Sequence, residues 1–330
     1  MSEYSIGDLI GMFGKPKPEP VTSSADEWFS DFLGWLETDY DKMVHSDRKP
    51  GLHASSLGSV CGRRNILIDV FGVNKVPHTA GNYLTCDVGH ALHYWWQERL
   101  LGPKQELLGD WMCVACVCDA CEGTLIRKLD RPCTYCRGTG RKVTSGLMPM
   151  NCACGVPWQD AIRYLETSVV DSVLNYVGHC DGVLDHKPKK RLFEFKTISA
   201  SEYEKLSKGP KDDHVVQAHA YMGPLGLEEA IILYENKASQ CTWSVNMFGQ
   251  FVAGVPKAIP FLVHYDEKLW AGIVERIHDH HKSVAILDDL KKADKQADRA
   301  DVSKLPRVCS DKKCNMAQRC PVSRECFSLD

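Results

Sequence analysis

The residues with the clearest chemical potential lie in the segment VGHCDGVLDHKPKKRLFEFKTIS, residues 177–199. Its pattern predicts two strands joined by a polar turn that contains proline. Residues i and i+2 of a strand share a face, so Glu194 and Lys196 should point the same way while Phe195 packs on the opposite side. If the hairpin brings Asp181 alongside, two carboxylates can bind a hard divalent cation, and the lysine can stabilise an activated water that attacks phosphorus. Alone, such a triplet is usually an exposed, salt-bridged strand.

Further short motifs stand around this triplet in chain order. Gly89-His90-Ala91-Leu92-His93 is a G-x3-H motif, Gly178-His179-Cys180-Asp181 is G-x-x-D, and Gln217-Ala218-His219-Ala220-Tyr221 is Q-x3-Y. Taken singly, the histidine would be an ordinary helix residue, and the glutamine and tyrosine an i, i+4 pair. With Glu194-Phe195-Lys196 between them, the motifs resemble the RecB-type branch of the PD-(D/E)XK nuclease superfamily. The resemblance is strongest to its iron-sulfur subgroup, which includes AddB-type helicase-nucleases and the nucleases of CRISPR spacer acquisition.

This resemblance implies a Mg²⁺- or Mn²⁺-dependent deoxyribonuclease. The implied fold is a PD-(D/E)XK restriction-endonuclease-like α/β core, a mixed central sheet flanked by helices. The expected activity is that of an exonuclease on DNA ends or single strands in replication, recombination or repair, with DNA and a helicase or single-strand-binding protein as partners. The roles carried over are cation binding by His93, Asp181, Glu194 and the carbonyl of Phe195, positioning of the nucleophile by Lys196, and positioning of that lysine or of the DNA by Gln217 and Tyr221.

Two other classes of protein remain open on the sequence. A noncatalytic zinc and iron-sulfur DNA-binding scaffold would keep the same core without turnover. A DnaJ-like chaperone or redox factor is disfavoured, because no His-Pro-Asp signature is present. Loss of cleavage in variants of the proposed site would separate the nuclease from the scaffold.

Eight of the 16 cysteines lie between residues 113 and 154 and form four close pairs. Such pairs place two thiolates about one tetrahedral edge apart, and two pairs complete a closed zinc site. The form C-x2-C-x-G-x-G resembles the zinc module of DnaJ chaperones over about 40 residues. The nested pairing of that family implies an inner zinc site of Cys118, Cys121, Cys133 and Cys136, and an outer site of Cys113, Cys116, Cys152 and Cys154.

A second cysteine group matches the iron-sulfur subgroup, in which one upstream and three downstream cysteines hold a [4Fe-4S] cluster. Cys61 occupies the upstream position, and Cys309, Cys314, Cys320 and Cys326 offer one ligand too many downstream. Either the first three or the last three of these complete the set, and zinc remains an alternative occupant. The cluster would close a very large loop of the chain.

Composition and pattern give the surrounding organisation. With 330 residues, 44% hydrophobic and 25% charged, the chain is typical of a globular protein. Its N-terminal segment is acidic and has no long apolar run, which favours a cytoplasmic location. A net charge of −3 leaves DNA to be held by local basic patches. The sequence predicts an N-terminal tail over 1–24, a nuclease domain over 25–108 and 158–330, and a zinc-binding insert over 109–157. Helices are expected over 26–44, 88–101, 213–222 and 267–290, and strands over 166–170, 173–177, 182–184, 191–195, 230–235 and 242–246.

Overall fold

The computed structural model divides into two compact units, residues 1–48 with 77–84 and residues 49–76 with 85–330. It describes residues 23–40, 52–58, 61–69, 80–124, 126–127, 131–132, 139–150, 154–186, 188–237, 244–245, 251–252, 258–292, 309, 311–313, 317, 320 and 322–328. The predicted tail lies almost wholly outside these residues, as do Cys133, Cys136, Cys152 and Cys314. The predicted domain boundaries therefore stay a prediction.

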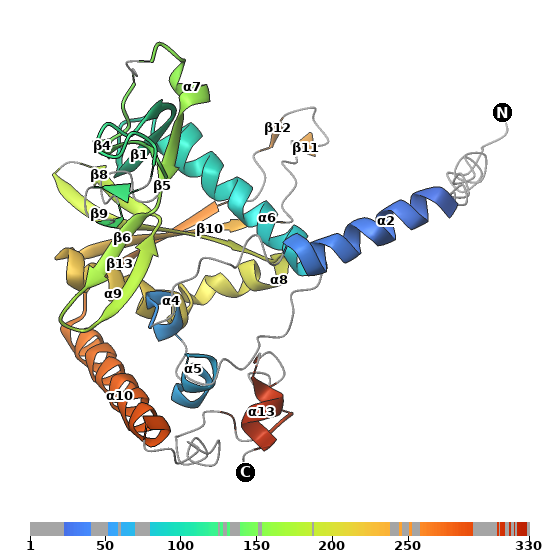
Figure 1. Ribbon diagram of the computed structural model, residues 1–330, viewed down its shortest axis with the longest axis vertical. Coiled ribbons are helices and arrows are strands. Elements are labelled where there is room, and N and C mark those ends of the chain that lie inside the picture. The colour runs from blue at the N-terminus through green and yellow to red at the C-terminus, as the bar shows by residue number, and fades with distance from the viewer. Residues whose placement is uncertain are drawn as a thin grey trace, which may run out of the picture. The chain divides into compact units, whose positions relative to one another are not determined.

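A seven-stranded mixed sheet forms the centre of the larger unit (Figure 1). Its order is β13-β10-β9-β8-β1-β4, and β5 also pairs with β1. Strands β9 and β10 are parallel, and the other pairs of this sheet are antiparallel. The strands are β1 (Leu107–Val117), β4 (Arg141–Leu147), β5 (Ile162–Leu165), β8 (Gly182–His186), β9 (Lys189–Ile198), β10 (Glu229–Asn236) and β13 (Ala258–His264).

Helices cover both faces of this sheet, which confirms the predicted mixed α/β architecture. On one face Phe195 and Leu233 form a core with Leu92 and Trp96 of the helical run α6 and η2. On the other face, strand residues such as Ile232 pack on helices α9 and α10. Figure 1 shows α6 above β10, with α9 and α10 below the strands. The helices are α6 (Ala80–Tyr94), η2 (Trp95–Leu101), α9 (Asp212–Leu225) and α10 (Glu267–Lys292).

A separate antiparallel hairpin leads directly into the site described below. It consists of β6 (Thr167–Asp171) and β7 (Tyr176–Cys180), with the pairing Thr167↔Cys180 at its base. The turn between them is capped by Asp171, whose Oδ1 accepts from the backbone N–H groups of Val173 and Leu174. The second strand thus begins at Tyr176, and the strand expected over 173–177 was placed too early, because an Asx turn occupies residues that read as β-branched and apolar.

Shorter elements complete the larger unit. Besides the β6–β7 hairpin, two further strand pairs lie outside the central sheet, β2 (Ile126–Arg127) with β3 (Arg131–Pro132) and β11 (Ser244–Val245) with β12 (Phe251–Val252). The short helices are α4 (Ala54–Leu57), α5 (Gly62–Asp69), α7 (Trp158–Ala161), α8 (Ala200–Tyr203), η3 (Glu204–Lys208) and α13 (Ser323–Ser328). Helices α5 and α13, far apart in sequence, lie in contact (Figure 1).

The smaller unit contains α2 (Ser23–Trp35), its π-helical continuation η1 (Leu36–Tyr40) and the first residues of α6. Leu36, Ala80 and Tyr83 form its buried cluster. The side chain of Glu37 accepts a 2.8 Å hydrogen bond from the backbone N–H of Ala80. Among the described residues, no helix has the length and apolar character needed to cross a membrane.

Candidate active site

The β8–β9 hairpin brings the two predicted carboxylates and the lysine together. Asp181 directly precedes β8, and Gly182 pairs with Phe193. The backbone N–H of Phe195 donates to Oδ2 of Asp181 at 2.7 Å. Glu194 and Lys196 face the same side, with Lys196 Nζ donating to Glu194 Oε2 at 2.8 Å. The hairpin geometry expected from the i, i+2 rule is therefore present.

Helix α6 brings His93 to the same place. Its Gly89 faces β9 so closely that an added Cβ would lie 3.3 Å from Oγ1 of Thr197. The ring of His93 packs edge-on against Phe195, and its Nδ1 lies 3.1 Å from Oδ1 of Asp181. These two atoms are close enough for a hydrogen bond but lack its alignment, since His93 Nδ1 is buried with no hydrogen-bond partner. A separation of 3.1 Å is that of an ion pair when the ring is protonated, and it also suits two ligand atoms of one cation when the ring is neutral.

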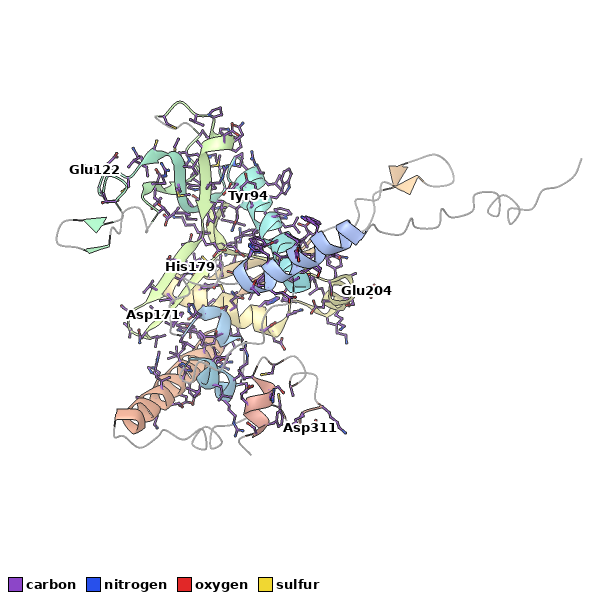
Figure 2. The ribbon with its side chains drawn as sticks, turned by 45° about the vertical axis from the view of Figure 1, so that its right-hand side comes forward. Tyr94, Glu122, Asp171, His179, Glu204 and Asp311 are labelled. Carbon is purple, nitrogen blue, oxygen red and sulfur yellow. The ribbon has the colours of Figure 1, made fainter. Side chains whose placement is uncertain are left out.

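Glu166 is a further residue of this site that the sequence motifs did not indicate. It directly precedes β6, whose first residue Thr167 pairs with Cys180, so Glu166 and Asp181 flank the base of the β6–β7 hairpin. One ligand atom each from His93, Glu166 and Asp181 lie within 4.8 Å of one another. Recognising the Asx turn in the sequence would have set this register and revealed the neighbour. In Figure 2, Asp171 lies toward the hairpin tip and His179 nearer its base.

The helical turn after His93 makes hydrogen bonds to the chain just before and just after the β6–β7 hairpin. Gln97 Nε2 donates to the carbonyl oxygen of Asp181 at 3.0 Å. The carboxylate of Glu98 accepts from the backbone N–H of Tyr164, two residues before Glu166, at 2.6 Å. The two neighbouring residues Gln97 and Glu98 are both buried, in the π-helical stretch η2. Because a π-helix has more residues per turn than an α-helix, adjacent side chains can share one face here.

Helix α9 positions the other side of the lysine. Gln217 Oε1 accepts from Lys196 Nζ at 3.1 Å, and Gln217 Nε2 donates to the hydroxyl of Tyr221 at 3.2 Å. The Q-x3-Y motif therefore forms one chain of hydrogen bonds to the lysine. Gly178 of the G-x-x-D motif lies beneath Tyr221, and a Cβ there would lie 2.5 Å from the tyrosine Cε1. That glycine is needed because no side chain fits between β7 and Tyr221.

The charges of the site leave an excess of acid. Burial raises the pKa of Glu194 to about 7, against the pull of Lys196 and with the help of Asp181. Burial and Asp181 raise the pKa of Glu166 to about 7 as well. Burial acts in the same direction on Asp181, but His93 and Lys196 hold the pKa of this carboxyl below its ordinary value. Three carboxyl groups thus share one lysine and one histidine.

These residues fit a hard divalent cation. Oε1 of Glu194 is buried and has no hydrogen-bond partner, which is costly unless something binds it. Carboxylate oxygens with one imidazole are a suitable donor set for Mg²⁺ or Mn²⁺. The site lies close to the protein surface, because the side chains of His93 and Lys196 remain 26% and 19% exposed.

The cysteines form a second chemical centre. The thiols of Cys113, Cys116 and Cys154 each place a sulfur within 4.8 Å of the others, and Cys118 and Cys121 are buried together. Cys326 is buried on α13, which contacts α5, the helix that follows Cys61. The structure thus brings three of the four predicted outer zinc ligands together, while Cys133, Cys136, Cys152 and Cys314 lie outside its described part.

Comparisons with known proteins find similarity only to solved structures. No protein-family model matches the chain, and no curated protein matches it. One match is a crystal structure of SSO0001, whose sequence is 12% identical to this chain. The matched region covers 92% of this chain and 98% of that chain, with a TM-score of 0.42. An alkaline exonuclease from Laribacter hongkongensis is 12% identical, with 83% and 100% covered and a TM-score of 0.34. A phage-related exonuclease from Haemophilus somnus 129PT is 16% identical, with 38% and 60% covered and a TM-score of 0.26.

Proposed function

We propose that this chain is a divalent-cation-dependent deoxyribonuclease with a PD-(D/E)XK restriction-endonuclease-like core. One observation carries the proposal: His93, Asp181, Glu194 and Lys196 come from two separate parts of the chain and form one linked network. His93 Nδ1 lies 3.1 Å from Asp181, Asp181 accepts from the backbone N–H of Phe195, and Lys196 donates to Glu194. Two of their ligand atoms are buried there without a hydrogen-bond partner. A salt-bridged structural strand would leave no such atoms unsatisfied.

The residues divide the work of phosphodiester hydrolysis between them. Asp181, Glu194, His93 and the carbonyl of Phe195 would hold Mg²⁺ or Mn²⁺, and Glu166 stands beside them as an additional carboxylate ligand. When bound, such an ion lowers the pKa of a coordinated water and neutralises charge on the scissile phosphate. Lys196 orients the attacking water and stabilises the extra negative charge of the transition state. Gln217, itself held by Tyr221, fixes the lysine ammonium in place.

We propose an exonuclease that acts on DNA ends or single strands in replication, recombination or repair. This form follows from the resemblance of the four motifs to RecB-type nucleases. A helicase or single-strand-binding protein would supply single-stranded substrate.

The direct test is incubation of the full chain with end-labelled single-stranded and duplex DNA in Mg²⁺, in Mn²⁺ and in EDTA. We expect shortened products that accumulate from an end, require the divalent ion and are absent in EDTA. A linear substrate should be degraded while a covalently closed circle of the same sequence persists. If metal-loaded protein binds DNA but leaves all substrates intact, the noncatalytic scaffold is correct instead.

We also propose zinc in the cysteine-rich insert and an iron-sulfur cluster at the end of the chain. The sulfurs of Cys113 and Cys154 are 3.7 Å apart. A tetrahedral zinc site with Zn–S bonds of about 2.3 Å has sulfurs roughly 3.8 Å apart, so this pair supports the outer site, with Cys116 and Cys152 as the other ligands. For the cluster, the contact of α5 with α13 supports Cys61 and Cys326 as ligands, and it favours the last three downstream cysteines, with Cys314 and Cys320 completing the set.

Metal analysis of two cysteine variants should separate these centres. Purified anaerobically, Cys113→Ser should lose about one zinc per chain and keep its iron, because a single thiolate completes the tetrahedral site. Cys61→Ser should lose iron, sulfide and the brown colour while keeping its zinc. Each variant controls for the other, since a general folding defect would lower both metals together. Colourless wild-type protein that contains zinc alone would refute the iron-sulfur cluster.

A further inference from the structure

His214 lies beside the proposed catalytic lysine without belonging to any of the motifs. It is on α9, three residues before Gln217, and its side chain is 18% exposed. The Nδ1 atom is 2.8 Å from the hydroxyl of Tyr234. Tyr234 is the register partner of Lys196 on the neighbouring parallel strand, so the two side chains lie on the same face of the sheet. His214 therefore lies over β10, the strand next to the one that carries Lys196.

The hydrogen bonds around Tyr234 fix which nitrogen of His214 carries the proton. The hydroxyl of Tyr234 accepts from the backbone N–H of Lys211 at 3.1 Å. Its own proton is then free to be donated to Nδ1 of His214, which must act as an acceptor. A neutral imidazole that accepts at Nδ1 carries its hydrogen on Nε2. Burial, reinforced by Lys196, lowers the pKa of His214 to about 4, so the ring stays neutral near pH 7.

The Nε2–H group of His214 is a donor held in place with nothing to bind. Among the described residues it makes no hydrogen bond, and Oδ2 of Asp213 lies 4.0 Å away on an exposed side chain. The other charged groups that act on the ring are Lys196, Lys211 and Glu202, and the last two form an ion pair with each other. A fixed donor without a hydrogen-bond partner does not stabilise the fold. The same donor is well placed to bind a ligand.

The surface beyond His214 indicates the ligand. Lys205 and Lys208 are exposed on η3, which precedes α9 and whose first residue, Glu204, is labelled in Figure 2. Lys196, His214 and these lysines offer N–H donors on β9, α9 and η3, and η3 ends three residues before Lys211, whose backbone N–H binds the Tyr234 hydroxyl beside His214. Phosphate oxygens of a nucleic-acid backbone accept such bonds whatever the base sequence.

We propose that His214 is a substrate-positioning residue whose Nε2–H binds a phosphate oxygen of the DNA strand next to the scissile phosphate. The inference rests on the proposed nuclease function and adds a strand contact to it. Because the donor is neutral, the contact orients the strand without adding to the counterion release that makes lysine contacts sensitive to salt.

Two isosteric variants test this role against a structural one. The amide of Asn reaches the position of Nδ1, so His214→Asn can still accept from Tyr234 but has no outward donor. The amide of Gln reaches the position of Nε2, so His214→Gln restores the outward donor and loses the acceptor. We expect His214→Asn to raise the KM for DNA about tenfold at nearly unchanged kcat, and His214→Gln to stay within about twofold of wild type. The reverse ranking, equal defects in both variants, or no defect in either would overturn the proposal.

Modified DNA locates the contact. A methylphosphonate is placed at successive positions near the cleaved end. At one position it should weaken DNA binding by the wild type, and at that position it should not weaken binding by His214→Asn. Equal sensitivity of both proteins at every position would rule out a phosphate contact. Binding measured by fluorescence anisotropy in Ca²⁺ keeps the two proposals separate. If wild type binds DNA without cutting it, the nuclease function fails, while the ranking of the two variants in binding still decides the role of His214.

Discussion

Replacing Lys196 with Met is expected to lower the rate of DNA cleavage about a thousandfold, in line with the loss of one preorganised charge from a transition-state site. The ammonium is held by Glu194 and Gln217, so it is already in position when the substrate arrives. Methionine keeps the length of the buried stem but carries no charge. The fold should survive, because Glu194, whose pKa is already about 7, can take up a proton when its partner is removed. The measurement is single-turnover cleavage of end-labelled DNA with saturating Mn²⁺.

Lys190→Met is the matched control, because Lys190 is on the same strand β9 and exposed. It makes the same chemical change away from the site and should leave kcat unaltered.

Asp181→Asn should reproduce the loss seen with Lys196→Met, since it removes one carboxylate charge from the proposed cation site and leaves the group that accepts from Phe195 N–H. Cleavage that persists in both Lys196→Met and Asp181→Asn would show that the hydrolytic site lies elsewhere in the chain.

The second large effect expected is a steep pH dependence of cation binding. Glu194 has a pKa raised to about 7, so below that pH a proton occupies the carboxyl and must leave before a cation binds. We expect the affinity for Mn²⁺ to fall at least tenfold for each pH unit below 7 and to level off above it, because Glu166, whose pKa is also raised to about 7, takes up a proton over the same range. Titration calorimetry or electron paramagnetic resonance between pH 5.5 and 8.5 would measure it, and Glu194→Gln should make the profile shallower by about one proton. An affinity that stays constant down to pH 5.5 would contradict the assignment.

The stability of the cation-free protein should change in the opposite sense. Between the ordinary pKa of a glutamate and about 7, the folded chain keeps a proton on Glu194 that the unfolded chain has released. The folded state therefore binds more protons in this window, and its free energy of unfolding falls as the pH rises. Asp181, whose pKa is lowered, contributes in the other direction, with stability that is present above its ordinary value and lost in strong acid.

Much of the site could be predicted from the sequence because its central part is local. Glu194 and Lys196 share a face by the two-residue period of a strand, and a short hairpin places Asp181 beside Phe195. His93 was predicted through the resemblance of its motif, since no rule of periodicity joins a helix to a strand over a hundred residues later. The mixed central sheet flanked by helices was also predicted through the resemblance, and the structure has this architecture.

The parts that could not be predicted depend on tertiary register. Glu166 reaches Asp181 because Thr167 pairs with Cys180, and that register is set by an Asx turn that reads as a strand. His214 gains its role through Tyr234, whose alignment with Lys196 is a property of parallel strands. Gln97 and Glu98 both point inward because the helix widens there. None of these contacts is indicated by residues at a fixed spacing in the sequence.

The hairpin formed by β6 and β7 has a practical consequence for engineering. Its two acidic residues stand at the open end and its capped turn at the far end, so the distance between the acids is set by the nearest rungs of the ladder. Exchanging the exposed residue Val173 at the tip should therefore spare the acidic pair. The tip offers a place to attach a label or change the surface charge without rebuilding the base of the hairpin.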